Sequence, residues 1–120
     1  MKFVGKSIIE KEQLQSKKKF GVFDMEIQLY GKDFSNDIKD MYKEIIKANI
    51  NVVSIHAPLR TSKRDDFNLE FFTNPEYSEI FIKTCKLAQL LANYYNHKVN
   101  IIIHNGISLY KYILMPCLFN

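Results

Sequence analysis

Residues 52–58 read Val-Val-Ser-Ile-His-Ala-Pro, and residues 99–106 read Val-Asn-Ile-Ile-Ile-His-Asn-Gly. Each stretch is a run of mostly β-branched, apolar residues that ends in a histidine and is followed by a turn former. Short apolar runs bounded by turn signals are typical of strands covered on both faces. The two histidines, His56 and His104, are then expected at the same rim of a parallel sheet, where α/β folds place their functional residues.

Two further strands precede these stretches. Residues 2–8 read as a short first strand, and residues 22–30 alternate apolar and polar side chains as a second. Between them, residues 9–19 read as a lysine-rich helix. Gly21 is placed to end this helix, because the residue after a helix often needs a positive φ.

The other two predicted helices have recognisable starts. Apolar residues recur with helical spacing over residues 38–46, with Ser35 as the expected N-cap. Residues 74–76, Asn-Pro-Glu, supply a cap, an N1 proline and a first-turn acid for a long helix that reaches Tyr95. Before it, residues 57–74 form a polar loop, and loops of this length are more often functional than incidental.

Four strands separated by three helices predict an α/β fold built from parallel (βα) units, because strand–helix–strand crossovers are right-handed and join parallel strands. We expect one partial (βα)4 domain over residues 1–120. The tail at residues 109–120 is apolar and breaks at Pro116. It is either the continuation of a fourth helix that begins near Ser108 or irregular.

The charge of the chain is uneven. The formal net charge of +4 arises in residues 1–20, which hold six lysines and two glutamates, whereas the remaining residues are balanced. A nucleic-acid partner is therefore not expected, since such proteins usually show a basic stripe with interleaved aromatics. The run Lys17-Lys18-Lys19 is interpreted as a solvated helix end, where cations also complement the helix dipole.

The cysteines and the apolar segments indicate the compartment. Cys85 and Cys117 have no metal-type spacing, so we expect free thiols in a reducing cytoplasm. The first residues lack the apolar core of a signal peptide, and no apolar stretch approaches the roughly 20 residues of a membrane span. We expect a cytoplasmic protein without a membrane partner.

Glu26 is the first candidate for chemistry. It lies in the second strand with Asp24 and Gln28 on the same face. Three polar side chains on one face of a covered sheet need a purpose, and an inward carboxylate is a candidate metal ligand or general base. The alternative, a face that is simply wet, is equally consistent with the pattern.

His56 and His104 are the other candidates. Neutral imidazole is a common ligand of divalent metals, and a carboxylate is its usual companion. For a single strand-end histidine, a hydrogen bond to a loop carbonyl is the simpler interpretation, but two equivalent positions in consecutive (βα) units favour a site. His97 lies in a polar turn at the opposite rim and has no expected role.

Three segments carry a family resemblance. Residues 25–29 (Met-Glu-Ile-Gln-Leu), 54–59 (Ser-Ile-His-Ala-Pro-Leu) and 103–106 (Ile-His-Asn-Gly) resemble the xylose isomerase-like TIM barrels. That superfamily includes sugar phosphate isomerases/epimerases and the endonuclease IV type of AP endonuclease. The resemblance implies that His56 and His104 are ligands or near-ligands of zinc, manganese or magnesium at the barrel mouth.

The resemblance covers half of the family fold, because a TIM barrel needs eight (βα) units and about 250 residues. It implies a half or truncated barrel whose Glu26, His56 and His104 serve metal-dependent proton transfer on a sugar or sugar phosphate. Such a chain needs a C-terminal half or forms a homo-oligomer. The alternatives are a non-catalytic fragment that self-associates through open strand edges and an AP endonuclease fragment.

Overall fold

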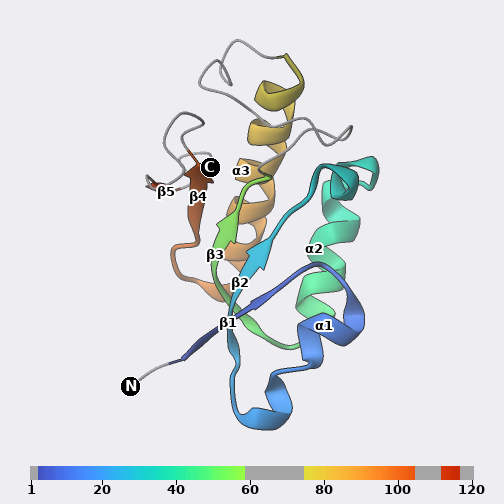
Figure 1. The fold of residues 1–120 in the computed structure, drawn as a ribbon, viewed down its shortest axis with the longest axis vertical. Coiled ribbons are helices and arrows are strands. Elements are labelled where there is room, and N and C mark those ends of the chain that lie inside the picture. The colour runs from blue at the N-terminus through green and yellow to red at the C-terminus, as the bar shows by residue number, and fades with distance from the viewer. Residues whose placement is uncertain (1–2, 59–74, 105–111, 117–120) are drawn as a thin grey trace.

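The computed structural model describes residues 3–58, 75–104 and 112–116. It contains strands and helices in alternation (Figure 1), with two short 3-10 helices, η1 and η2. In chain order the elements are β1 (Val4–Ser7), α1 (Lys11–Gln15), η1 (Lys18–Phe20), β2 (Asp24–Gln28), η2 (Gly31–Ser35), α2 (Ile38–Lys47), β3 (Asn51–His56), α3 (Pro75–Tyr95), β4 (Asn100–His104) and β5 (Tyr112–Pro116).

The strands form one sheet in the order β1-β2-β3-β4-β5. β1 to β4 pair in parallel, which confirms the α/β prediction of parallel strands joined by helical connections. The predicted strands and the long third helix lie where the sequence placed them, to within two or three residues at each end.

The tail departs from the prediction. Tyr112–Pro116 is a strand, β5, which pairs antiparallel with β4, where we expected a helix or irregular chain. Its run of aromatic and branched residues has strand propensity, and pairing satisfies an edge of β4 that would otherwise be open. The proposed helix start at Ser108 lies outside the described residues.

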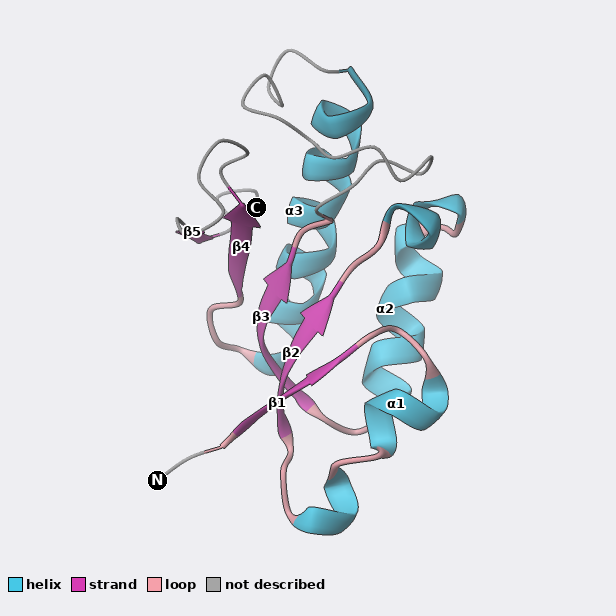
Figure 2. Ribbon diagram, in the orientation of Figure 1, coloured by secondary structure: helices cyan, strands magenta, loops and turns pink. Residues whose placement is uncertain are grey.

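The apolar core lies between the sheet and the helices. On β2 the side chains of Met25 and Ile27 are fully buried, whereas Glu26 between them is only partly buried. These apolar side chains form one cluster with Ile45 of α2 and Leu91 of α3. α2 and α3 pack against each other and cover this face of the sheet (Figure 2), so the polar residues of β2 point to the opposite face.

The start of α2 differs from the prediction. Its N-cap is Asp37, whose carboxylate accepts a hydrogen bond from the Lys39 backbone N–H at 3.3 Å. Ser35, the expected cap, ends η2 instead, and its hydroxyl donates to the carbonyl of Lys32 at 2.8 Å. The Ser35 hydroxyl is therefore engaged within η2, and the N-cap of α2 lies two residues later than expected.

The lysine-rich helix is broken in two. α1 ends at Gln15 and η1 follows, closed by Gly21 at φ +79°, as expected for this glycine. The lysine run lies at the end of these helical turns, and two of its members also make hydrogen bonds to other segments. Lys17 Nζ donates to the Lys6 carbonyl and Lys18 Nζ to the Ala48 carbonyl, each at 2.8 Å. Ala48 is the C-cap of α2, so Lys18 places its charge at the C-terminus of a different helix.

The predictions for the cysteines, the polar loop and the membrane spans can also be compared with the structure. Cys85 is buried in α3, whereas Cys117 lies outside the described residues. Most of the predicted polar loop, residues 59–74, also lies outside them. Within the described part of the chain, none of the helices has the length and apolar character needed to cross a membrane.

Candidate functional site

The polar side chains of the sheet gather on the face opposite the helices. Lys6 of β1 pairs in register with Glu26 of β2, and Glu26 pairs with Ser54 of β3. The next row pairs Gln28 with His56. Register partners in a parallel ladder point to the same side of a sheet. These five residues therefore share one face, which we call the polar face.

A β-bulge brings β3 onto this face. The register runs from Met25–Val52 directly to Glu26–Ser54, so Val53 is passed over. Without the extra residue, Val53 would lie opposite Glu26, and Ser54 would lie opposite Ile27 on the helix-covered face. The bulge thus turns Ser54 and His56 toward Glu26.

Two neighbours hold the Glu26 carboxylate. Ser54 Oγ donates a hydrogen bond to Glu26 Oε1 at 3.1 Å, and Lys6 Nζ lies 3.4 Å from Oε2. The Glu26 side chain is 20% exposed and that of Lys6 58% exposed. Glu26 is therefore a fixed carboxylate that remains accessible from the polar face.

His56 is nearly buried, at 4% exposure. Its Nδ1 lies 2.8 Å from the carbonyl oxygen of Ala57. Because a carbonyl oxygen can only accept, Nδ1 carries the proton, and the neutral ring then has its lone pair on Nε2. Burial lowers the pKa of His56, opposed by the hydrogen bond to Ala57; Lys6 lowers it further and Glu26 raises it.

His104 is brought to the same rim of the sheet. β4 ends at His104, two residues beyond Ile102, which is the register partner of His56. Its side chain lies outside the part of the structure that is described. Among the described residues, no group of three or more His, Cys, Asp or Glu side chains could hold a metal ion. His56 and His104 as a pair of ligands therefore remain a prediction.

Lys6 and Ser54 were not among the site residues predicted from the sequence. Lys6 carries the pattern that identified Glu26, since it lies on a strand between residues of the covered face, whereas the bulge breaks this alternation at Ser54. Pairing the first three strands in register would have found Lys6 beside Glu26. It would not have found Ser54, because the bulge at Val53 leaves no clear mark in the sequence.

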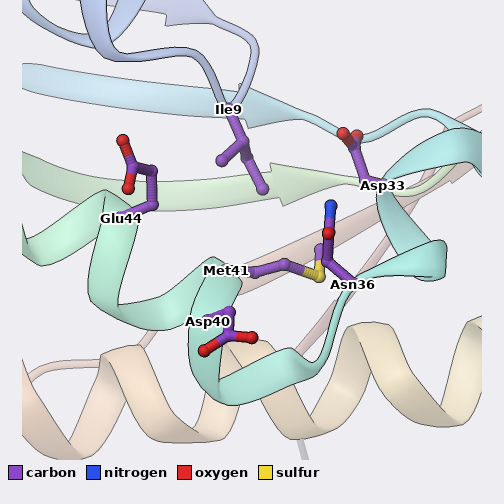
Figure 3. A pocket seen from close by; sticks show the side chains of 6 residues that line it. All are labelled: Ile9, Asp33, Asn36, Asp40, Met41 and Glu44. Atoms are coloured by element: carbon purple, nitrogen blue, oxygen red, sulfur yellow. The ribbon is translucent and has the colours of Figure 1, made fainter.

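A separate acidic pocket of about 280 Å³ is lined by three segments. These are the chain that follows β1, the turn η2 that follows β2, and the start of α2. Figure 3 shows its lining side chains, which are Ile9, Asp33, Asn36, Asp40, Met41 and Glu44. Asp33 Oδ2 accepts from the Tyr30 backbone N–H at 2.7 Å. Burial raises the pKa of Asp33, and the hydrogen bond from Tyr30 and the charge of Lys32 oppose this. None of these residues was a predicted site residue.

At the opposite rim, His97 is part of a polar chain. Its Nε2 lies 2.6 Å from Asn51 Oδ1, and Asn51 Nδ2 donates to Asp24 Oδ1 at 2.9 Å. The imidazole stacks on the ring of Tyr95 with centroids 5.2 Å apart. These contacts join β2, β3 and the turn after α3, so Asp24 and His97 connect elements of the fold at this rim.

Comparison with protein-family models gave no match, and comparisons with curated proteins and with solved structures gave none either. The polar face and the short motifs of its strands are therefore the features that bear on function.

Proposed function

We propose that the polar face is one side of a divalent-metal site in a sugar phosphate isomerase/epimerase-like enzyme of the cytoplasm. The observation that carries this proposal is the state of His56. The ring is buried at the carboxyl end of β3, where burial lowers its pKa, and it is oriented by a hydrogen bond from Nδ1 to the Ala57 carbonyl. Histidines that bind a metal through one nitrogen almost always donate the other N–H to a carbonyl or carboxylate.

The donor set fits a metal with some nitrogen preference. His56 and His104 would hold it, and imidazole ligands favour zinc, whereas a carboxylate such as that of Glu26 also suits manganese or magnesium. When bound, such an ion polarises a carbonyl group of the substrate. Glu26 would act as the general base that takes a proton from the carbon beside that carbonyl. Ser54 and Lys6 keep the Glu26 carboxylate directed along the polar face.

The arrangement of the sheet supports a half-barrel. In a TIM barrel the helices cover the outside of the parallel strands, and the opposite side of the strands lines the interior below the active-site mouth. β1 to β4 have helices on one face and polar residues on the other, in the same sense. In a complete barrel the edge of β4 would pair with a parallel fifth strand, so β5 would have to leave it. The remaining ligands would come from a second half or a second copy of the chain.

Calorimetric titration with Zn²⁺ and Mn²⁺ tests the metal site. We expect weak binding by the wild-type chain, a loss of binding in His56→Ala and in His104→Ala, and no binding by the double variant. His97→Ala is the matched control, because it removes the third histidine from the opposite rim, and it should bind as the wild type does. Equal heats for the wild type and the double variant would show that these histidines bind no metal.

A further inference from the structure

β1 forms one end of the sheet, and its outer edge can be assigned from the backbone. Along a strand, the N–H and C=O groups of successive residues point to alternate sides. On β2 the Phe23 carbonyl and the Leu29 N–H both bond to β3. The odd-numbered residues of β2 therefore direct their backbone groups to β3, and Glu26 directs its groups to β1.

The outward groups of β1 follow from this alternation. In a parallel ladder only one residue of each register pair directs its backbone groups at the other strand. Glu26 is that residue in its pair with Lys6. The N–H and C=O of Lys6 consequently point away from β2, and those of Val4, two residues earlier, do the same. Val4 is also 52% exposed, and its neighbour Phe3 is 67% exposed.

Within the described part of the chain, the side chain of Lys17 contacts this edge. Lys17 Nζ donates to the outward carbonyl of Lys6 at 2.8 Å. The lysine stem reaches the carbonyl by passing over Gly5, where a Cβ atom would lie only 2.7 Å from Lys17 Cδ. The contact therefore depends on a glycine at position 5, and charged side chains at strand edges are a common protection against pairing with other chains.

We propose that the outer edge of β1 is a self-association surface for a second copy of this chain, and that Lys17 competes with the partner for it. In an antiparallel pair with its twofold axis at Gly5, Val4 lies opposite the partner's Lys6. The Val4 N–H then donates to the carbonyl of the partner's Lys6, which is the group that Lys17 bonds in the single chain. This register places each Lys6 opposite a valine, so the two lysines do not face each other across the pair.

This inference does not rest on the proposed function. It uses backbone groups at the sheet edge and the side chain of Lys17, none of which belongs to the proposed metal site. Loss of metal binding would leave it intact, and a failure of β1 to pair with a second copy would still leave a second half of the barrel as the source of the remaining ligands.

Sedimentation velocity over a concentration series tests the proposal on the full chain. Lys17→Met removes the competing donor and keeps the stem, so we expect its dimer to form about tenfold more tightly than that of the wild type. Gly5→Ala places a Cβ 2.7 Å from Lys17 Cδ and 2.9 Å from Sδ of the buried Met25, so it should lower the stability of the fold and also displace Lys17, which shifts association in the same direction. Val4→Pro in the Lys17→Met background removes an outward N–H and should restore the monomer.

Lys19→Met is the matched control, because it removes the same charge from an exposed neighbouring lysine and should associate as the wild type does. Far-UV circular dichroism confirms that each variant is folded. Association in Lys17→Met and Gly5→Ala that is no tighter than in the wild type would overturn the proposal. A dimer that persists with Val4→Pro, or an equal effect of Lys19→Met, would overturn it as well.

Discussion

The hydroxyl of Ser54 donates to the carboxylate of Glu26 at 3.1 Å because a β-bulge shifts the pairing of β2 and β3 by one residue. Bulges are frequent next to active sites, where they redirect side chains. Here the shift changes the face on which the end of β3 presents His56. One inserted residue, Val53, therefore decides whether the imidazole faces the helices or the polar face.

Ser54→Ala should lower the free energy of unfolding by about 1 kcal/mol, since it removes a partly buried hydrogen bond to a carboxylate. Urea denaturation at neutral pH measures the change. Ser35→Ala is the matched control, because that hydroxyl bonds a carbonyl in an exposed turn, and we expect less than about 0.5 kcal/mol. An equal decrease in the free energy of unfolding of both variants would show that the Ser54–Glu26 hydrogen bond stabilises the fold no more than the exposed Ser35 hydrogen bond does.

The stability of the chain should fall as the pH is lowered from 7 toward 5. Burial lowers the pKa of His56. The unfolded chain therefore takes up a proton near pH 6.5, while the folded chain resists it until a lower pH. The stability that His56 contributes is complete above the unfolded pKa and is lost as the pH falls through the folded pKa. Urea curves at several pH values should show this slope, and His56→Gln should reduce it. An unchanged slope in that variant would contradict the assignment.

The protonation of Asp33 should change the stability of the fold with pH in the opposite direction. Burial raises its pKa, so the folded chain holds the proton more tightly than the unfolded chain. The stability gained from this proton is complete below the unfolded pKa of about 3.9 and is lost as the pH rises through the folded pKa. Asp33→Asn should therefore be at least as stable as the wild type at pH 7, because the amide oxygen can still accept from Tyr30. Asp37→Asn is the control, since asparagine caps a helix as well as aspartate does, and thermal melts at pH 4 and pH 7 compare the two.

The strands could be predicted because their apolar residues follow the period of a covered sheet. The alternation on β2 predicted that Glu26 shares a face with other polar residues, and the structure confirms this. The positions of His56 and His104 at the carboxyl ends of β3 and β4 also follow from the order of strands and helices.

The rest depends on contacts between segments far apart in the sequence. The N-cap of α2 is Asp37 and not Ser35, because the Ser35 hydroxyl bonds within η2. The strand β5 pairs with the edge of β4, which is a contact that the sequence of the tail alone does not specify. Lys18 was interpreted by its local run of charge, but the group that it bonds is at Ala48, thirty residues away. The bulge at Val53 depends on how β2 and β3 pair, so the sequence of neither strand alone predicts it.

Asn51 joins β2, β3 and the turn after α3, because its amide donates to Asp24 and its oxygen faces His97. Asn51→Ala should therefore destabilise the fold by about 1–2 kcal/mol, since it takes a partner from a carboxylate and from an imidazole at once. Asn93→Ala is the matched control: its side chain accepts from Gln89 on the exposed surface of α3, and its loss should cost under about 0.5 kcal/mol. Urea denaturation of both variants gives the comparison. Metal titration of Asn51→Ala should match the wild type, because Asn51 lies at the rim opposite His56. A loss of metal binding in this variant without a loss of stability would show that the two rims are coupled in a way that the contacts of Asn51 do not explain.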